Sequence, residues 1–150
     1  MLKATAGKML PTTVTGSLPR PSWYTENLGI KVDADVITFE TKSSGAMDLE
    51  DVGKRITEKK IGIGAIDHHT LQVESPEEVA DLVRLALKHI PAERLVLSSD
   101  CGMGREGMSR RHASYKMVSL VQGTNIVRKE LGLPLAECLA ADPKYSLIRS

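Results

Sequence analysis

Three short apolar segments of β type recur along the chain, and each one stops at side chains that can bind a metal or move a proton. The segments and the side chains that follow them are residues 36–39 with Glu40, residues 61–66 with Asp67, His68 and His69, and residues 95–98 with Asp100 and Cys101. We therefore predict strands over residues 35–40, 61–66 and 95–98. Since residues 36, 37 and 39 are apolar on both faces of the first segment, we expect a parallel sheet covered by helices.

Helical periodicity separates these segments. Ser75-Pro76-Glu77-Glu78 has the pattern of a capping box with proline at the first helical position, and an apolar stripe then runs to Ile90. A shorter apolar pattern over residues 49–56 predicts a helix after the first of the three strands. A long helix is predicted between a cap at Ser109 and Gly132. Its expected apolar face is Ala113, Met117, Leu120, Val121, Thr124, Val127 and Leu131.

The spacing of these units predicts the fold. Residues 10–18 form a further β-rich segment, so the order is one isolated strand followed by three strand–helix units. Glu40 and His69 are 29 residues apart, and His69 and Cys101 are 32 apart. This matches the roughly 31 residues per unit of a (β/α)8 barrel of about 250 residues. We predict a single α/β domain, a partial TIM barrel made of the first strand and the last three units. Residues 1–8 are expected to be an extension and residues 133–150 a tail.

Composition narrows the classes of partner. The 20 Lys and Arg balance 19 Asp and Glu, for a formal net charge of +1. Nucleic acid and acidic membranes need a concentrated basic face, so neither is expected as a partner. No segment approaches the roughly 18 apolar residues of a membrane span, and the first residues lack the apolar region of a signal peptide. Since two cysteines are too few for a disulfide scaffold, we predict a cytoplasmic protein.

Glutamate, histidine and cysteine on one rim of a barrel indicate zinc, because carboxylate, imidazole and thiolate are its usual ligands. His68 and His69 alternate in direction, so at most one of them is expected to point into a common site. A second motif, G-x-G-x-x-G at residues 102–107, leaves nucleotide binding open as an alternative. A dinucleotide site would need a further strand ending in an acid about 20 residues later, and no such pattern follows.

With these residues identified, the chain resembles the catalytic barrel of cobalamin-independent methionine synthase and its shorter single-barrel relatives. The resemblance spans residues 9–132 and includes a D-x-H and a D-C-G element whose order and spacing are quite specific. The stretches that carry it are LPTTVTGSLPR (10–20), DVITFE (35–40), IGIGAIDHHTLQVES (61–75) and SDCG (99–102).

The resemblance implies methyl transfer from 5-methyltetrahydrofolate, including its polyglutamate form, to homocysteine, which yields methionine. It implies that Thr15, Gly16 and Ser17 hold the amino-acid end of homocysteine and that Glu40 and Cys101 are zinc ligands. His69 would be the proton donor and Asp67 would orient it. In such enzymes zinc favours the thiolate of homocysteine, and a general acid protonates N5 of the folate as the methyl group leaves.

The chain departs from the family pattern in two ways. The family supplies two more zinc ligands as a His-x-Cys pair, and no His-x-Cys occurs in this sequence. The middle of the barrel, with most folate contacts, is also missing, and residues 27–33 are the expected junction. We hypothesise an internally deleted or truncated form that binds zinc weakly and turns over little. Because four strands cannot close an eight-stranded barrel, a homo-oligomer joined through exposed sheet edges, without catalysis, is the alternative.

Overall fold

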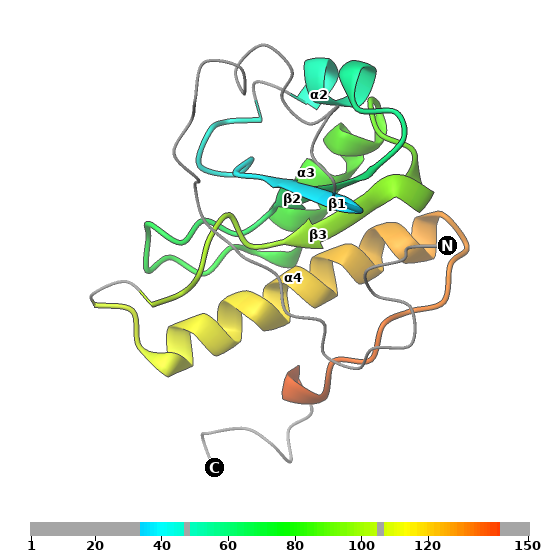
Figure 1. Cartoon of the computed structure of the whole chain (residues 1–150). Helices are drawn as coiled ribbons and strands as arrows, with labels where there is room; N and C mark the ends of the chain where they lie inside the picture. Colours follow the sequence, from blue (N-terminus) through cyan, green and yellow to red (C-terminus); the bar gives the residue numbers. More distant parts are fainter. Residues whose placement is uncertain (1–33, 47–48, 105–106, 142–150) are drawn as a thin grey trace, which may run out of the picture.

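The computed structural model describes residues 34–46, 49–104 and 107–141, and the structural statements below concern these residues. Strands and helices alternate along this part of the chain (Figure 1). In order they are β1 (Val36–Phe39), α2 (Leu49–Arg55), β2 (Lys60–Gly64), α3 (Pro76–Leu87), the short 3-10 helix η1 (Ala92–Arg94), β3 (Leu95–Ser98), α4 (Arg110–Glu130) and the short 3-10 helix η2 (Leu139–Ala141). Within these ranges, no helix is both long and apolar enough to cross a membrane.

The three strands form one parallel sheet in the order β1-β2-β3. Phe39 pairs with Ile63, and Ile63 pairs with Leu97, so the carboxyl ends of all three strands lie at the same edge. Figure 1 shows the strands side by side, with α2 near one end and the long α4 beside β3. The three predicted strands are therefore confirmed, although β2 ends two residues earlier than expected. The β-rich segment at 10–18 and the junction at 27–33 lie outside the described residues.

The described helices pack against one face of this sheet. Alternate strand residues join the two apolar clusters that α2, α3 and α4 complete, and these strand residues are Ile37, Phe39, Ile61, Ile63, Leu95 and Leu97. Burial on both faces is correct for β2, where every residue from Ile61 to the end of the strand is buried. For β1, from which burial on both faces was expected, the expectation is wrong, because Thr38 is exposed and the other three residues are half-buried. The strand β3 is also half-buried throughout. Each outer strand has a described neighbour on one side.

Local sequence signals determine where the helices begin. The Ser75 hydroxyl accepts from the Glu78 N–H at 3.2 Å, and the Ser75 N–H donates to the Glu78 carboxylate at 2.7 Å. This reciprocal pair is the predicted capping box at the start of α3. Ser109 caps α4 by accepting from the His112 N–H at 3.3 Å, and Gly132 takes the left-handed φ of 67° just past the helix end.

The inner face of α4 matches the predicted one in part, because Val127 is buried and Met117 and Leu120 pack against the same apolar cluster. Its buried residues are Lys116, Ser119, Gly123 and Val127, whereas Leu131 is 49% exposed. The reason is the close approach of α3 at Gly123, where a Cβ atom would lie 2.5 Å from Val79 Cβ. The face of α4 that packs inward therefore includes a glycine and a lysine beside the predicted apolar residues, and the hydrophobic pattern alone does not predict them.

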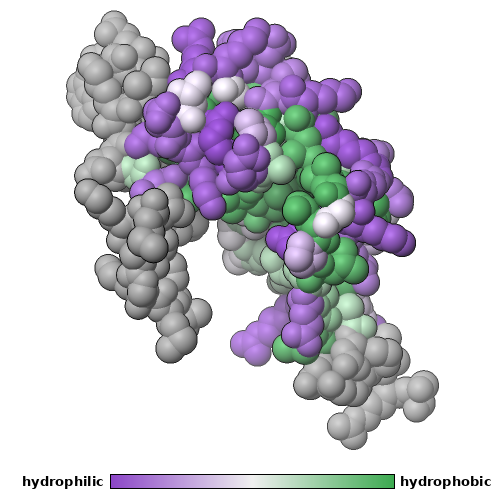
Figure 2. All heavy atoms as spheres, turned by 90° about the vertical axis from the view of Figure 1, so that its right-hand side faces the viewer, coloured by the Kyte–Doolittle hydropathy of each residue, from purple (hydrophilic) through white to green (hydrophobic). Residues whose placement is uncertain are grey.

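A band of hydrophobic surface lies exposed on the side of the molecule where α4 ends (Figure 2). Four large apolar side chains after α4 are between 46% and 59% exposed, namely Leu131, Leu133, Leu135 and Leu139. Exposed apolar surface of this kind is typical of a contact with another polypeptide.

Candidate metal centre at the strand ends

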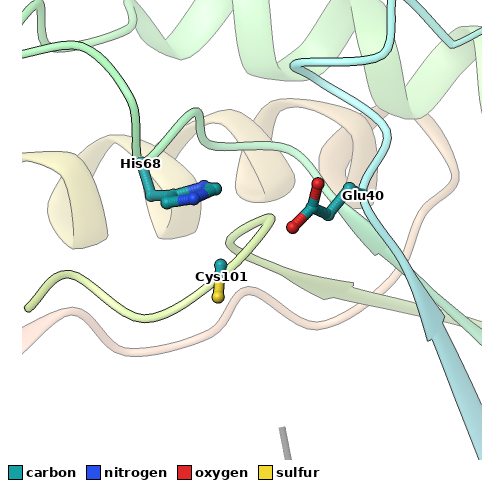
Figure 3. A group of neighbouring side chains, drawn as sticks. All are labelled: Glu40, His68 and Cys101. Atoms are coloured by element: carbon teal, nitrogen blue, oxygen red, sulfur yellow. The ribbon is translucent and has the colours of Figure 1, made fainter. Parts of the chain in front are cut away.

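The parallel sheet brings three chemically active side chains together from distant parts of the sequence. Glu40 follows β1, His68 follows β2, and Cys101 follows β3. One carboxylate oxygen, one imidazole nitrogen and the thiol sulfur all lie within 4.8 Å of one another. Figure 3 shows the His68 ring and the Glu40 carboxylate pointing toward one another, with Cys101 below them and its sulfur turned away in this view. The predicted pair Glu40 and Cys101 is thus close together, and an imidazole accompanies it.

The imidazole in this cluster belongs to His68 rather than to His69. The side chain of His68 is 3% exposed, and its Nδ1 atom has no hydrogen-bond partner within the described part of the chain. Alternation along the chain predicted that at most one of the two rings would point into a common site, but it could not choose between them. His68 was therefore one of two open candidates, and only the family resemblance favoured His69, as the proton donor. The two ring centroids are 3.9 Å apart and the rings are tilted by 43°.

His69 pairs with Asp67 at the edge of the same cluster. The Asp67 carboxylate accepts from the His69 backbone N–H at 2.7 Å and lies 3.0 Å from the ring Nδ1. Burial opposes ionisation of Asp67, but the hydrogen bonds from the backbone and ring of His69 outweigh it, so the pKa of Asp67 is lowered. An ionised Asp67 favours a proton on Nδ1 of His69, which leaves Nε2 to exchange a proton with a ligand. The side chain of His69 is 44% exposed and accessible for such an exchange.

Asp100 joins the loop that carries Glu40 to the loop that carries Cys101. Its Oδ1 accepts from the backbone N–H groups of Thr41 at 2.8 Å and Lys42 at 3.0 Å, and its Oδ2 accepts from the Ser43 N–H at 2.7 Å. Gly64 makes room for this carboxylate, because a Cβ atom there would lie 1.9 Å from Oδ1. The relative position of the two predicted metal ligands therefore depends on Asp100, which the sequence pattern marks as a strand-end acid but not as a link between these loops.

Hydrogen bonds from Lys116 fix the position of the loop that carries His68 and His69. Lys116 is 0% exposed, and its ammonium group donates to the backbone oxygens of Asp67 (3.0 Å) and Gln72 and to both carboxylate oxygens of Glu74 at 3.0–3.1 Å. Glu74 Oε1 in turn accepts from the Asp67 N–H at 2.9 Å. This buried ion pair holds the start of the loop from both sides. No sequence pattern places a lysine of α4 inside the molecule.

The other predicted site residues are not part of this cluster. Thr15, Gly16 and Ser17 lie outside the described residues. The glycine motif at 102–107 is described except for residues 105–106, and no strand follows α4 up to residue 141. The described chain therefore lacks the second strand that a dinucleotide site requires.

A parallel α/β sheet with acid, imidazole and thiol groups at the carboxyl ends of its strands is the arrangement of an α/β enzyme active site. The sequence model of the family described as "Cobalamin-independent synthase, Catalytic domain" matches residues 23–122. The chain therefore belongs to the cobalamin-independent synthase family, as its resemblance indicated.

Individual relatives agree with this assignment. A methionine synthase from Thermococcus kodakarensis is 43% identical over 93 residues, which are 62% of this chain and 27% of that protein. One from Saccharolobus solfataricus is 38% identical over 101 residues, 67% of this chain and 30% of that protein. The chain thus spans less than a third of the length of these relatives.

A solved structure is also similar. It is a B12-independent methionine synthase from Shewanella sp. W3-18-1 in complex with selenomethionine. It matches with a TM-score of 0.61 and 39% sequence identity, over 67% of this chain and 28% of that chain. The parallel sheet and its helices therefore have the fold of part of a methionine synthase.

Proposed function

We propose that this chain carries the methyl-transfer site of a cobalamin-independent methionine synthase. The reaction would move a methyl group from 5-methyltetrahydrofolate, or its polyglutamate form, to the thiol of homocysteine. The observation that carries the proposal is the cluster of Glu40, His68 and Cys101 donor atoms within 4.8 Å, next to the Asp67–His69 pair. The methionine synthases among the relatives support the reaction class.

Zinc fits the residues at this site. The cluster offers oxygen, nitrogen and sulfur donors, which together form a typical zinc ligand set, and it contains a buried imidazole nitrogen with no hydrogen-bond partner in the described ranges of the chain. Glu40 and Cys101 would hold the ion. When bound, zinc would supply Lewis acidity that favours the thiolate form of homocysteine at neutral pH.

The remaining roles belong to side chains of the chain itself. His69 would give a proton to N5 of the folate as the methyl group leaves, since the unprotonated folate is a poor leaving group. Asp67 would hold the His69 ring through the 3.0 Å contact at Nδ1. By resemblance, Thr15, Gly16 and Ser17 would contact the amino-acid end of homocysteine.

The architecture we propose is an incomplete (β/α)8 barrel within a single domain. The units β1–α2, β2–α3 and β3–α4 would be its last three, with residues 10–18 as the first strand, residues 27–33 as the junction and residues 133–150 as the tail. Turnover would be slow, because the sequence has no His-x-Cys pair and most folate contacts would be missing. The free thiols of Cys101 and Cys138 fit a reducing compartment such as the cytoplasm.

A second candidate function is self-association without catalysis, and the exposed leucines after α4 favour it. We expect the chain to form dimers at micromolar concentration, measured by size-exclusion chromatography with light scattering. Leu133→Gln with Leu135→Gln should shift the population toward monomer if this surface is used, whereas Leu71→Gln, at an equally exposed leucine elsewhere, should not. A monodisperse monomer across the concentration range would contradict association.

Recognition of a thiol is the first step that the proposed reaction requires. Homocysteine should bind the zinc-loaded chain at least about tenfold more tightly than homoserine, which has a hydroxyl in place of the thiol, because zinc prefers sulfur to a neutral hydroxyl. Isothermal titration calorimetry measures the difference. Cys101→Ser should remove the preference, and Cys138→Ser should retain it. Equal affinity for the two amino acids would contradict the proposal.

A further inference from the structure

We propose that His68 is a metal ligand, so that Glu40, His68 and Cys101 hold the ion with one side chain from each strand end. The inference rests on the proposed function in one respect, namely that a metal binds at Glu40 and Cys101. It goes beyond that function because it adds a ligand that the family resemblance does not supply.

The first observation is the state of the His68 side chain. It is 3% exposed, and the Nδ1 atom is buried with no hydrogen-bond partner among the described residues. Buried polar atoms in folded proteins nearly always have a partner, so an orphaned one requires an explanation. A neutral imidazole nitrogen is also among the commonest metal ligands. A cation bound at this nitrogen would supply the missing partner.

The second observation is what surrounds the ring. An imidazole nitrogen of His68 lies within 4.8 Å of both a Glu40 oxygen and the Cys101 sulfur. Zinc binds such donors at about 2.0–2.3 Å, so side-chain rotations, including one at Cys101, would bring all three donors onto one ion. Catalytic zinc sites commonly use three protein ligands and keep one position open. The three residues at this edge would match that number of protein ligands.

The neighbouring His69 has a different partner, the carboxylate of Asp67. Its Nδ1 lies 3.0 Å from the Asp67 carboxylate, its backbone N–H donates to the same carboxylate, and its side chain is 44% exposed. The two adjacent imidazoles therefore have different surroundings. His69 has a carboxylate partner and contact with solvent, whereas His68 faces the donors of the metal cluster.

The backbone around His68 is held in place before any metal arrives. Lys116 donates to the Asp67 carbonyl at 3.0 Å, and Glu74 accepts from the Asp67 N–H at 2.9 Å. A ligand on a backbone that is already fixed by hydrogen bonds loses less conformational entropy on binding a metal than a ligand on a flexible loop. His68 also occupies the middle position of the D-x-H element, in a sequence that contains no His-x-Cys pair. Its ring would therefore add an imidazole to the pair of Glu40 and Cys101.

The decisive experiment reads the ligands of zinc directly. The sequence contains four histidines, His68, His69, His89 and His112. In the tag-free full chain carrying His69→Gln, His89→Gln and His112→Gln, any imidazole bound to zinc must belong to His68. X-ray absorption spectroscopy of this zinc-loaded variant should retain the imidazole scattering and the sulfur scattering of the parent chain. Loss of the imidazole scattering would overturn the inference, whether or not a His68 variant folds.

Two single variants, His68→Gln and His69→Gln, test by their metal affinity whether His68 is a ligand. Cobalt(II) titration, followed by visible absorption, should show His68→Gln binding at least about tenfold more weakly than the parent chain, whereas His69→Gln should bind as the parent does. Far-UV circular dichroism of the metal-free variants checks that both are folded. Equal cobalt affinity of His68→Gln and the parent would overturn the inference.

The outcomes separate this inference from the proposed function. Dependence of metal binding on His68, without any methyl transfer, would support the inference and contradict the function. Methyl transfer that requires Cys101, together with metal binding that does not depend on His68, would support the proposed function and contradict the inference. A parent chain that binds neither zinc nor cobalt would overturn the inference and the zinc-dependent mechanism together.

Discussion

Replacing Lys116 with methionine is expected to destabilise the protein by about 3–5 kcal/mol, because it leaves the buried Glu74 carboxylate without its cation. Lys116 is fully buried and donates to two backbone oxygens as well as to both oxygens of Glu74. Methionine has a similar length but no donor. The loss is a large part of the roughly 5–15 kcal/mol that stabilises a typical domain.

Urea denaturation measures this change in the free energy of unfolding. Lys54→Met is the matched control, since Lys54 also pairs with a glutamate, Glu50, but its side chain is 67% exposed. The control should hardly move the unfolding midpoint, because water solvates both partners of a surface pair. Adding Glu74→Gln to Lys116→Met should recover part of the loss. A Lys116→Met midpoint close to that of Lys54→Met would show that the buried pair does not hold the loop.

Replacing Asp100 with alanine is expected to cost about 2–4 kcal/mol, because three backbone N–H groups lose a charged acceptor. These N–H groups belong to Thr41, Lys42 and Ser43, directly after Glu40. The same change should weaken cobalt binding, since the loop that carries Glu40 would no longer be tied to the loop that carries Cys101.

The experiment combines a urea melt with cobalt titration. Asp100→Asn keeps one carbonyl oxygen and should lose about half as much stability as Asp100→Ala. Asp81→Ala is the control at an exposed aspartate, which pairs with Arg84 at the surface of α3. It should change neither the unfolding midpoint nor the cobalt affinity. Undiminished cobalt affinity in Asp100→Ala would contradict the role of Asp100 in positioning the two ligands.

The elements of the fold were predictable because their signals are local. The Ser75 capping box, the Ser109 cap and Gly132 each lie where neighbouring residues predict a helix end, and the structure has all three. The apolar segments before Glu40, Asp67 and Cys101 predicted parallel strands. Since parallel strands end at a common edge, the closeness of Glu40 and Cys101 could also be expected from the sequence.

The features that the sequence did not predict depend on contacts between distant elements. The choice between His68 and His69 depends on where β2 ends and on how the following residues turn. Lys116 is buried because Glu74 and two carbonyl groups, more than 40 residues away, supply acceptors for it. Hydrophobic periodicity gives a lysine no reason to lie inside. For the same reason, it does not predict that a glycine lies at the contact between α3 and α4.

We propose that the strand-end cluster of this short chain transfers a methyl group to a thiol. The most direct measurement is the transfer of an isotope-labelled methyl group from 5-methyltetrahydrofolate to homocysteine by the purified, zinc-loaded chain. We predict slow formation of labelled methionine that depends on zinc, is abolished by Cys101→Ser and is unchanged in Cys138→Ser. Absence of labelled methionine, or its formation at the same rate in Cys101→Ser, would contradict methyl transfer at this cluster.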